Sequence, residues 1–182
     1  MIKKIKKILD KKNKSKIVCL TAYSKSIASI LDKFVDIILV GDSMANVLYG
    51  HKNTHKISLK NILQHTSSVK MGVNNSLLVV DMPKGSYQNI KIANKNVKLV
   101  INKTKCDAIK LESNGKNYKI IESLVKKKIP VMGHIGYTPQ FKRNFKIEGT
   151  SKLDGLKLLK EAKAIEEAGA FSIVLECISP WT

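Results

Sequence analysis

The chain has 182 residues, of which 43% are apolar, and this is enough for one domain with a sizeable core. No apolar run reaches the roughly 18 residues of a membrane span, and the basic start lacks a signal peptide's apolar stretch. The cysteines are odd in number and form no Cys-x-x-Cys pair, which favours buried free thiols at Cys19, Cys106 and Cys177. These features predict a cytoplasmic protein with no membrane partner.

The net charge of +19 raises the question of nucleic-acid binding. Lysine accounts for all but one of the 33 basic residues, the exception being Arg143, whereas base recognition relies heavily on arginine. The lysines follow no dominant stripe, and aromatic residues for stacking on bases make up only 5%. We therefore expect no specific nucleic-acid partner, only weak and salt-sensitive association.

Short β-rich runs alternate with longer helix-like stretches along the chain, a pattern that indicates βαβ units and a parallel sheet. The predicted strands are 17–21, 37–40, 77–80, 108–111, 131–133 and 172–175. The predicted helices are 26–33, 59–71, 90–103, 118–127 and 152–168. In the last helix, Leu156, Leu159, Ala162 and Ala168 fall near one face. A basic amphipathic helix with Ile2, Ile5 and Ile8 precedes them, and we expect it to pack on its own domain.

Six units in this length amount to about 30 residues each, so eight would need roughly 240, close to a complete (β/α)8 barrel. No linker or repeat divides the sequence. The prediction is a single α/β domain over residues 1–182, a TIM-type barrel with about six of its eight βα units.

Polar residues follow the predicted strands at the points where they end. They are Asp42 and Ser43, Asp81, Lys110 and Glu112, His134, and Glu176. In a parallel barrel the carboxyl ends of the strands converge on one face, so these residues could line one pocket. Carboxylates suit a hard divalent cation, and a lysine and a histidine suit an anionic substrate with a carbonyl group.

Each residue also has a structural interpretation. Asp42 and Asp81 could start turns, and Lys110 with Glu112 could form an ion pair on one strand face. His134 could be a hydrogen-bonded core histidine, and Glu176 could be exposed. Their recurrence at five consecutive strand ends favours the functional interpretation.

Several blocks resemble the ketopantoate hydroxymethyltransferases, in that family's order and with similar spacing. The longest is Val40-Gly-Asp-Ser-Met-Ala-Asn-Val-Leu-Tyr-Gly-His51, followed by Thr54 and His65-Thr66. The others are Thr21-Ala-Tyr23, Val80-Asp-Met-Pro-Lys-Gly-Ser-Tyr87, Ile109-Lys-Leu-Glu112, Val131-Met-Gly-His-Ile-Gly-Tyr-Thr-Pro-Gln140 and Val174-Leu-Glu-Cys177. The resemblance extends from Ile17 to Ser179.

This resemblance implies transfer of a hydroxymethyl group from 5,10-methylenetetrahydrofolate to 3-methyl-2-oxobutanoate, giving 2-dehydropantoate for pantothenate biosynthesis. It also implies Mg2+ as cofactor and a large cyclic homo-oligomer. By position, Asp42 and Asp81 match magnesium ligands that border the substrate, and Glu112 matches a ligand or an outer-shell partner. Ser43, Lys110 and His134 match substrate-binding residues, and Glu176 matches the proton acceptor. No residue is assigned to the folate.

The chain departs from the family pattern at several places. Ser24 replaces an aspartate, Ala45 a glycine and Lys84 a phenylalanine, and the loop after Gln140 is shorter. Strands seven and eight are absent, so we expect little transferase activity from residues 1–182 alone.

Three other functions fit parts of the sequence. A Gly-Asp-Ser-Leu esterase fits Gly41-Asp-Ser-Met44, but no histidine of the chain has an aspartate three residues before it. A related barrel lyase acting on 2-oxo acids with magnesium is disfavoured by the block 133–140. An inactive remnant of the transferase is left open by the sequence.

Overall fold

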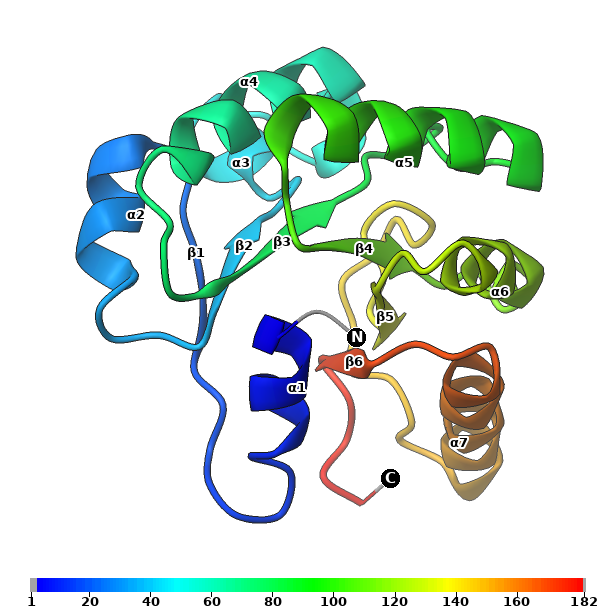
Figure 1. The fold of residues 1–182 in the computed structure, drawn as a ribbon. Coiled ribbons are helices and arrows are strands. Elements are labelled where there is room, and N and C mark those ends of the chain that lie inside the picture. The colour runs from blue at the N-terminus through cyan, green and yellow to red at the C-terminus, as the bar shows by residue number, and fades with distance from the viewer. Residues whose placement is uncertain (1–2, 182) are drawn as a thin grey trace. The chain divides into compact units, whose positions relative to one another are not determined.

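The computed structural model describes residues 3–181 (Figure 1). The chain divides into two compact units, 1–109 and 110–182. The first unit contains α1 Lys3–Leu9, β1 Cys19–Thr21, α2 Lys25–Leu31, β2 Ile37–Val40, α3 Met44–Val47, η1 Thr54–Lys56, α4 Leu59–Lys70, β3 Leu77–Asp81 and α5 Ile90–Thr104. The second contains α6 Tyr118–Lys126, β5 Val131–Gly136, α7 Lys152–Glu167 and β6 Ser172–Glu176, while β4 Ala108–Glu112 crosses the division. The single-domain expectation stays a prediction.

In the first unit, β1, β2 and β3 pair in parallel and in chain order, with Leu20 beside Ile38 and Ile38 beside Leu78. The strand β3 is buried at every position, as expected for a parallel strand covered on both faces. Helices α2, α4 and α5 lie side by side along these strands (Figure 1). Each of these three helices begins at a side-chain cap, supplied by Ser24, Ser58 and Asn89.

The helix α1 packs on its own unit through Ile5 and Ile8, which are 3% and 4% exposed. Lys4 donates to the Ser76 carbonyl just before β3, and Lys11 pairs with Asp36 just before β2 at 2.6 Å. The helix therefore lies at the amino ends of these strands, as expected for a helix that packs on its own domain. Ile2 lies outside the described residues.

In the second unit, β5 and β6 pair in parallel, with His134 beside Val174 and Gly136 beside Glu176. Helices α6 and α7 pack against β5. The side chain of Ile165 on α7 occupies the space next to Gly133, where an added Cβ would lie 2.6 Å from a methyl carbon. A glycine at this position therefore permits the close approach of α7 to β5.

The buried face of α7 differs from the predicted one. Leu158 and Ile165 are buried, whereas Leu156 and Leu159 are 55% and 48% exposed. Leucines occur around most of this helix, so their spacing alone did not identify the face that packs on β5.

The cysteines also differ in part from the prediction. All three are free, but only Cys106 is buried, Cys177 is half-buried and Cys19 is exposed. Burial raises the pKa of Cys106 to about 11, so this thiol stays protonated at neutral pH.

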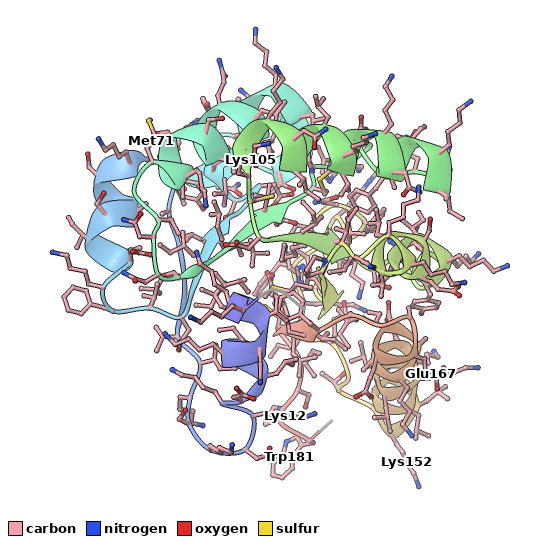
Figure 2. All side chains as sticks on the ribbon, viewed as in Figure 1. Lys12, Met71, Lys105, Lys152, Glu167 and Trp181 are labelled. Atoms are coloured by element: carbon pink, nitrogen blue, oxygen red, sulfur yellow. The ribbon has the colours of Figure 1, made fainter. Side chains whose placement is uncertain are left out.

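Within residues 3–181, every helix is too short or too polar to cross a membrane. The lysines lie at many separate places on the surface of the first unit, as Lys12 and Lys105 illustrate (Figure 2).

Candidate active site at the carboxyl ends of the strands

Two buried aspartates lie at neighbouring strand ends in the first unit. Asp81 is the last residue of β3, and Asp42 follows β2 by two residues. Because Val40 of β2 pairs with Val80 of β3, the segments that follow these two strands leave the sheet side by side. Asp42 and Asp81 are 4% and 2% exposed, whereas most carboxylates in folded proteins lie on the surface.

Ser43 belongs to a hydrogen-bonded network in the same unit. Its hydroxyl lies 2.8 Å from the Tyr23 hydroxyl, and the Tyr23 carbonyl lies 2.7 Å from Nδ1 of His65. Nε2 of His65 lies 2.8 Å from the Tyr49 hydroxyl. The network holds the loop after β2 against the loop after β1 and against α4.

Sequence reasoning assigned a role to Ser43 but none to Tyr23, Tyr49 or His65. All three lie in the blocks that carry the family resemblance, and that was the available signal. Lys84, a departure from the family pattern, is exposed, and its Nζ lies 3.2 Å from the His55 ring.

In the second unit, a histidine lies between two carboxylates. Nε2 of His134 lies 3.2 Å from Oε2 of Glu176, and its Nδ1 lies 3.9 Å from Oε1 of Glu112. His134 and Glu112 are almost fully buried, whereas the Glu176 side chain is 39% exposed. The structure therefore brings three of the predicted residues together, with Glu176 at the open end of the row.

One backbone amide bonds the inner carboxylate of this row. The Gln140 amide donates to Oε2 of Glu112 at 2.9 Å, and the Asn117 side-chain amide donates to the main-chain carbonyl of Glu112 at 2.9 Å. Lys110, two residues earlier on β4, is also buried, at 5% exposure. Burial first, and then the negative charges of Glu176 and Glu112, raise the pKa of Tyr137 beside them.

Glycine at 136 permits a close approach of the backbone of Glu176. Its φ is +90°, and a Cβ there would lie 2.1 Å from the main-chain carbonyl oxygen of Glu176. Glu176 is also the register partner of Gly136, so a larger residue at 136 would disturb the end of the β5–β6 pair.

Two buried carboxylates at adjoining strand ends are a donor set that Mg2+ accepts, with its other positions on water or substrate oxygens. Asp42 and Asp81 therefore fit the predicted metal. Over residues 3–181, however, no three Asp, Glu, His or Cys side chains form a group that could hold a metal ion. The set of Asp42, Asp81 and Glu112 stays a prediction.

The fold defines the structural class of the protein. Solved structures with this fold include 2,3-dimethylmalate lyase, a PEP mutase/isocitrate lyase superfamily member, with a TM-score of 0.69 at 12% identity, covering 97% of this chain and 62% of that one. A phosphonopyruvate hydrolase complex with oxalate and Mg++ gives a TM-score of 0.69 at 14% identity, covering 95% and 62%. At such identities the likeness shows the fold alone, which is the predicted (β/α) barrel class with six strands in the described residues.

Residues 2–181 match the model of the ketopantoate hydroxymethyltransferase family, and the chain belongs to this family. The 3-methyl-2-oxobutanoate hydroxymethyltransferase of Pelagibacter ubique is 53% identical over 178 residues, covering 98% of this chain and 69% of that protein. The enzyme of the same name from Anaplasma marginale (strain St. Maries) is 42% identical over 183 residues, covering 99% and 66%. The chain thus spans about two thirds of the length of these relatives.

Proposed function

We propose that the protein transfers a hydroxymethyl group from 5,10-methylenetetrahydrofolate to 3-methyl-2-oxobutanoate and forms 2-dehydropantoate, in pantothenate biosynthesis in the cytoplasm. The observation that carries this proposal is the row Glu112–His134–Glu176 at the strand ends of a chain in this family. A 2-oxo acid must lose a proton from C3 before it can attack the one-carbon unit. The row ends in a carboxylate that is partly open to solvent and can take that proton.

Glu176 accepts the C3 proton in this proposal. Nε2 of His134 lies 3.2 Å from its carboxylate, so a protonated His134 would attract the carboxylate and limit its motion. Glu112 accepts a hydrogen bond from the Gln140 amide, and its other oxygen lies 3.9 Å from Nδ1 of His134. In this arrangement the base lies beside His134 before the substrate binds.

The acidic residues of the first unit have a different role. Asp42 and Asp81 would hold Mg2+, and a bound Mg2+ supplies Lewis-acid polarisation of the keto oxygen. Ser43, fixed by Tyr23, binds the substrate, and Lys110 adds positive charge where the oxyanion develops.

The experiment separates two steps. Deuterium exchange at C3 of 3-methyl-2-oxobutanoate in D2O with Mg2+ reports the proton transfer, and 2-dehydropantoate formation with methylenetetrahydrofolate reports the complete reaction. We expect both. A folded protein that shows neither reaction is the inactive remnant.

We also propose a homo-oligomer, supported by the exposed apolar side chains Leu153, Leu156 and Leu159 on α7, at 64%, 55% and 48% exposure. Light scattering should give a mass well above the 20.3 kDa of one chain. A stable monomer at micromolar concentration would contradict this.

A further inference from the structure

A cavity of about 400 Å3 lies at the amino ends of the strands in the first unit, and none of the roles above uses it. Among its lining residues, Val18 directly precedes β1, Asp36 directly precedes β2 and Leu77 begins β3. Asp42 and Asp81 lie at the opposite ends of β2 and β3. The volume is within the range of cavities that hold small molecules. This cavity is therefore separate from the candidate metal site.

Lysine is the most frequent residue in the lining of this cavity. The lysines come from α1 and the turn after it, from the segment before β1, and from the residues after α2, and they are Lys4, Lys7, Lys11, Lys16 and Lys33. Asp32 and Asp36 are the acidic residues of the lining, so its formal net charge is +3. Charges of one sign in a confined cavity raise the local potential and attract counter-ions.

The two aspartates of the lining already have donors within the protein. One oxygen of Asp36 accepts from the Lys11 ammonium at 2.6 Å, and the other accepts from the Val18 amide at 3.0 Å. Asp32 accepts from the amides of residues 74–76. These bonds use the carboxylates for the structure of the unit, so the carboxylates do not pair with the other lysines.

Three of the five lysines have no acidic partner. Lys4 and Lys11 form ion pairs with N–O distances of 3.4 and 2.6 Å. Within residues 3–181, no acidic side chain lies at ion-pair distance from Lys7, Lys16 or Lys33. All three are exposed, so a dissolved anion can reach them. Their mutual repulsion is relieved when an anion binds between them.

We propose that this cavity binds the diphosphate group of a small molecule. A phosphoryl group carries about −1.5 to −2 at neutral pH. One such group leaves part of the +3 unmatched, whereas two linked groups match it. Lysine binds phosphate as a point charge with three N–H donors, so Lys7, Lys16 and Lys33 can each contact a different oxygen. The site does not depend on the proposed function.

The binding of inorganic pyrophosphate, measured by titration calorimetry, tests the site. EDTA removes divalent metals, so Mg2+ at Asp42 and Asp81 cannot bind the probe, and about 150 mM salt screens weak surface association. We expect one pyrophosphate per chain. The triple variant Lys7→Ala, Lys16→Ala and Lys33→Ala should raise the Kd by at least about tenfold, because charge-assisted hydrogen bonds are lost. Absence of saturable binding to the unchanged protein overturns the proposal.

A matched triple variant separates this cavity from general attraction to a basic protein. Lys6→Ala, Lys14→Ala and Lys25→Ala remove the same charge from α1, the segment before β1 and α2, and these exposed lysines do not line the cavity. Their Kd should stay within about threefold of the unchanged protein. Equal increases of the Kd in the two triple variants overturn the proposal, because only net charge would then matter.

Single changes cover the case in which the first triple variant fails to fold. Lys7→Ala should raise the Kd for pyrophosphate, and its neighbour Lys6→Ala should not, although both alter an exposed lysine of α1. Pyrophosphate should also raise the Tm of the unchanged protein and of Lys6→Ala more than that of Lys7→Ala. Equal shifts of the Tm in these two variants would contradict the site.

A comparison with ADP identifies what the diphosphate is attached to. Phe34 lines the cavity and is 74% exposed, so the base of a nucleotide can pack on its ring. Tighter binding of ADP than of pyrophosphate, with the gain lost in Phe34→Ala, indicates a nucleotide. Equal affinities indicate that the diphosphate alone is recognised. If ADP binds equally well to the unchanged protein and to the first triple variant, its diphosphate lies elsewhere and the proposal is wrong.

Discussion

The Glu176 carboxylate lies between a buried neighbour and the solvent. Its neighbour His134 is 1% exposed, while its own side chain is 39% exposed. A base of this kind is oriented by the protein and reachable by a substrate. The charge of Glu176 also contributes, after burial, to the raised pKa of Cys177, the next residue in the chain.

Replacing Glu176 by glutamine should remove the proposed base and leave the size and shape of the side chain nearly unchanged. We expect the rate of C3 deuterium exchange to fall by about a hundredfold to ten-thousandfold, the usual contribution of general-base catalysis. Glu122→Gln, which alters only an exposed ion pair with Lys126 on α6, is the control and should retain the full rate. Exchange by the Glu176 variant within tenfold of the unchanged protein would exclude it as the base.

Asp32 is a second buried carboxylate, with a structural function. It is 5% exposed and accepts from the amides of Asn74, Asn75 and Ser76 at 2.8–3.1 Å. Burial, the largest single influence, acts to raise its pKa, but these amides together outweigh it and the pKa falls below 3.8. The bonds fasten the turn before β3 to the end of α2.

The lowered pKa of Asp32 fixes the sign of its pH dependence. Because the folded state binds the proton less tightly than the unfolded state, the contribution is complete above about pH 4 and is lost as the pH falls through the folded-state value. Asp32→Asn should lower the free energy of unfolding at neutral pH by about 2 kcal/mol, and the difference should shrink near pH 3. Urea denaturation measures both, with the exposed Asp10→Asn as control. A constant difference across this range would contradict the charge-based explanation.

The helix α4 begins with a capping box formed by Ser58 and Asn61. The Ser58 hydroxyl accepts from the Asn61 amide at 3.2 Å, and the Asn61 side chain accepts from the Ser58 amide at 3.0 Å. This reciprocal pair satisfies two amides that have no partner within the helix. The helix carries His65 and Thr66, so its start also positions the Tyr23 network.

Removal of this cap should destabilise the protein by a predictable amount. Ser58→Ala should lower the free energy of unfolding by about 1 kcal/mol. Ser67→Ala, an exposed change inside the same helix, should instead be neutral or slightly stabilising because alanine is the better helix former. If both serines gave the same change in thermal unfolding, the cap would not be the cause.

The long elements were predictable from the sequence because their apolar periodicity and caps agree. The helices at 59–71 and 90–103 were predicted to within one residue of the observed ends, as was the strand at 37–40. Helix α3 and the turn η1 were missed, since four- and three-residue helices show no periodicity. Strand β5 continues to Gly136, beyond the predicted end at 133, because β6 pairs with its last residues.

The positions of the candidate residues were predictable to a similar degree. The structure places Asp81, Glu112 and Glu176 at the last position of a strand and Asp42 two residues after one, as predicted, but His134 lies inside β5 and does not follow it. Their roles stay a prediction. The contacts of Ser43 with Tyr23 and of Ser113 with Glu161 join distant segments, and only the folded chain brings them together. The amide of Gln140 on Glu112 is equally hidden, because a backbone donor has no sequence signature.

At the scale of the whole molecule, the net charge of +19 governs association with polyanions. Lysines on solvated surfaces attract any polyanion without recognising its sequence. We expect two unrelated DNA duplexes to bind with equal affinity, and this affinity should fall at least about tenfold between 50 and 200 mM salt. Fluorescence anisotropy measures both quantities. A clear preference for one duplex that persists at the higher salt would indicate a specific site.

The contact of Gly133 with Ile165 has an evolutionary consequence. The space for a Cβ at 133 is occupied by the branched side chain at 165, so neither position can change freely alone. Among homologous proteins these two positions should covary: alanine or serine at the first should occur with a smaller residue at the second. A collection of relatives in which alanine at 133 accompanies isoleucine at 165 without a shift of α7 would contradict this. The size of the side chain at 165 therefore limits which residues can occupy position 133, although the two lie far apart in the sequence.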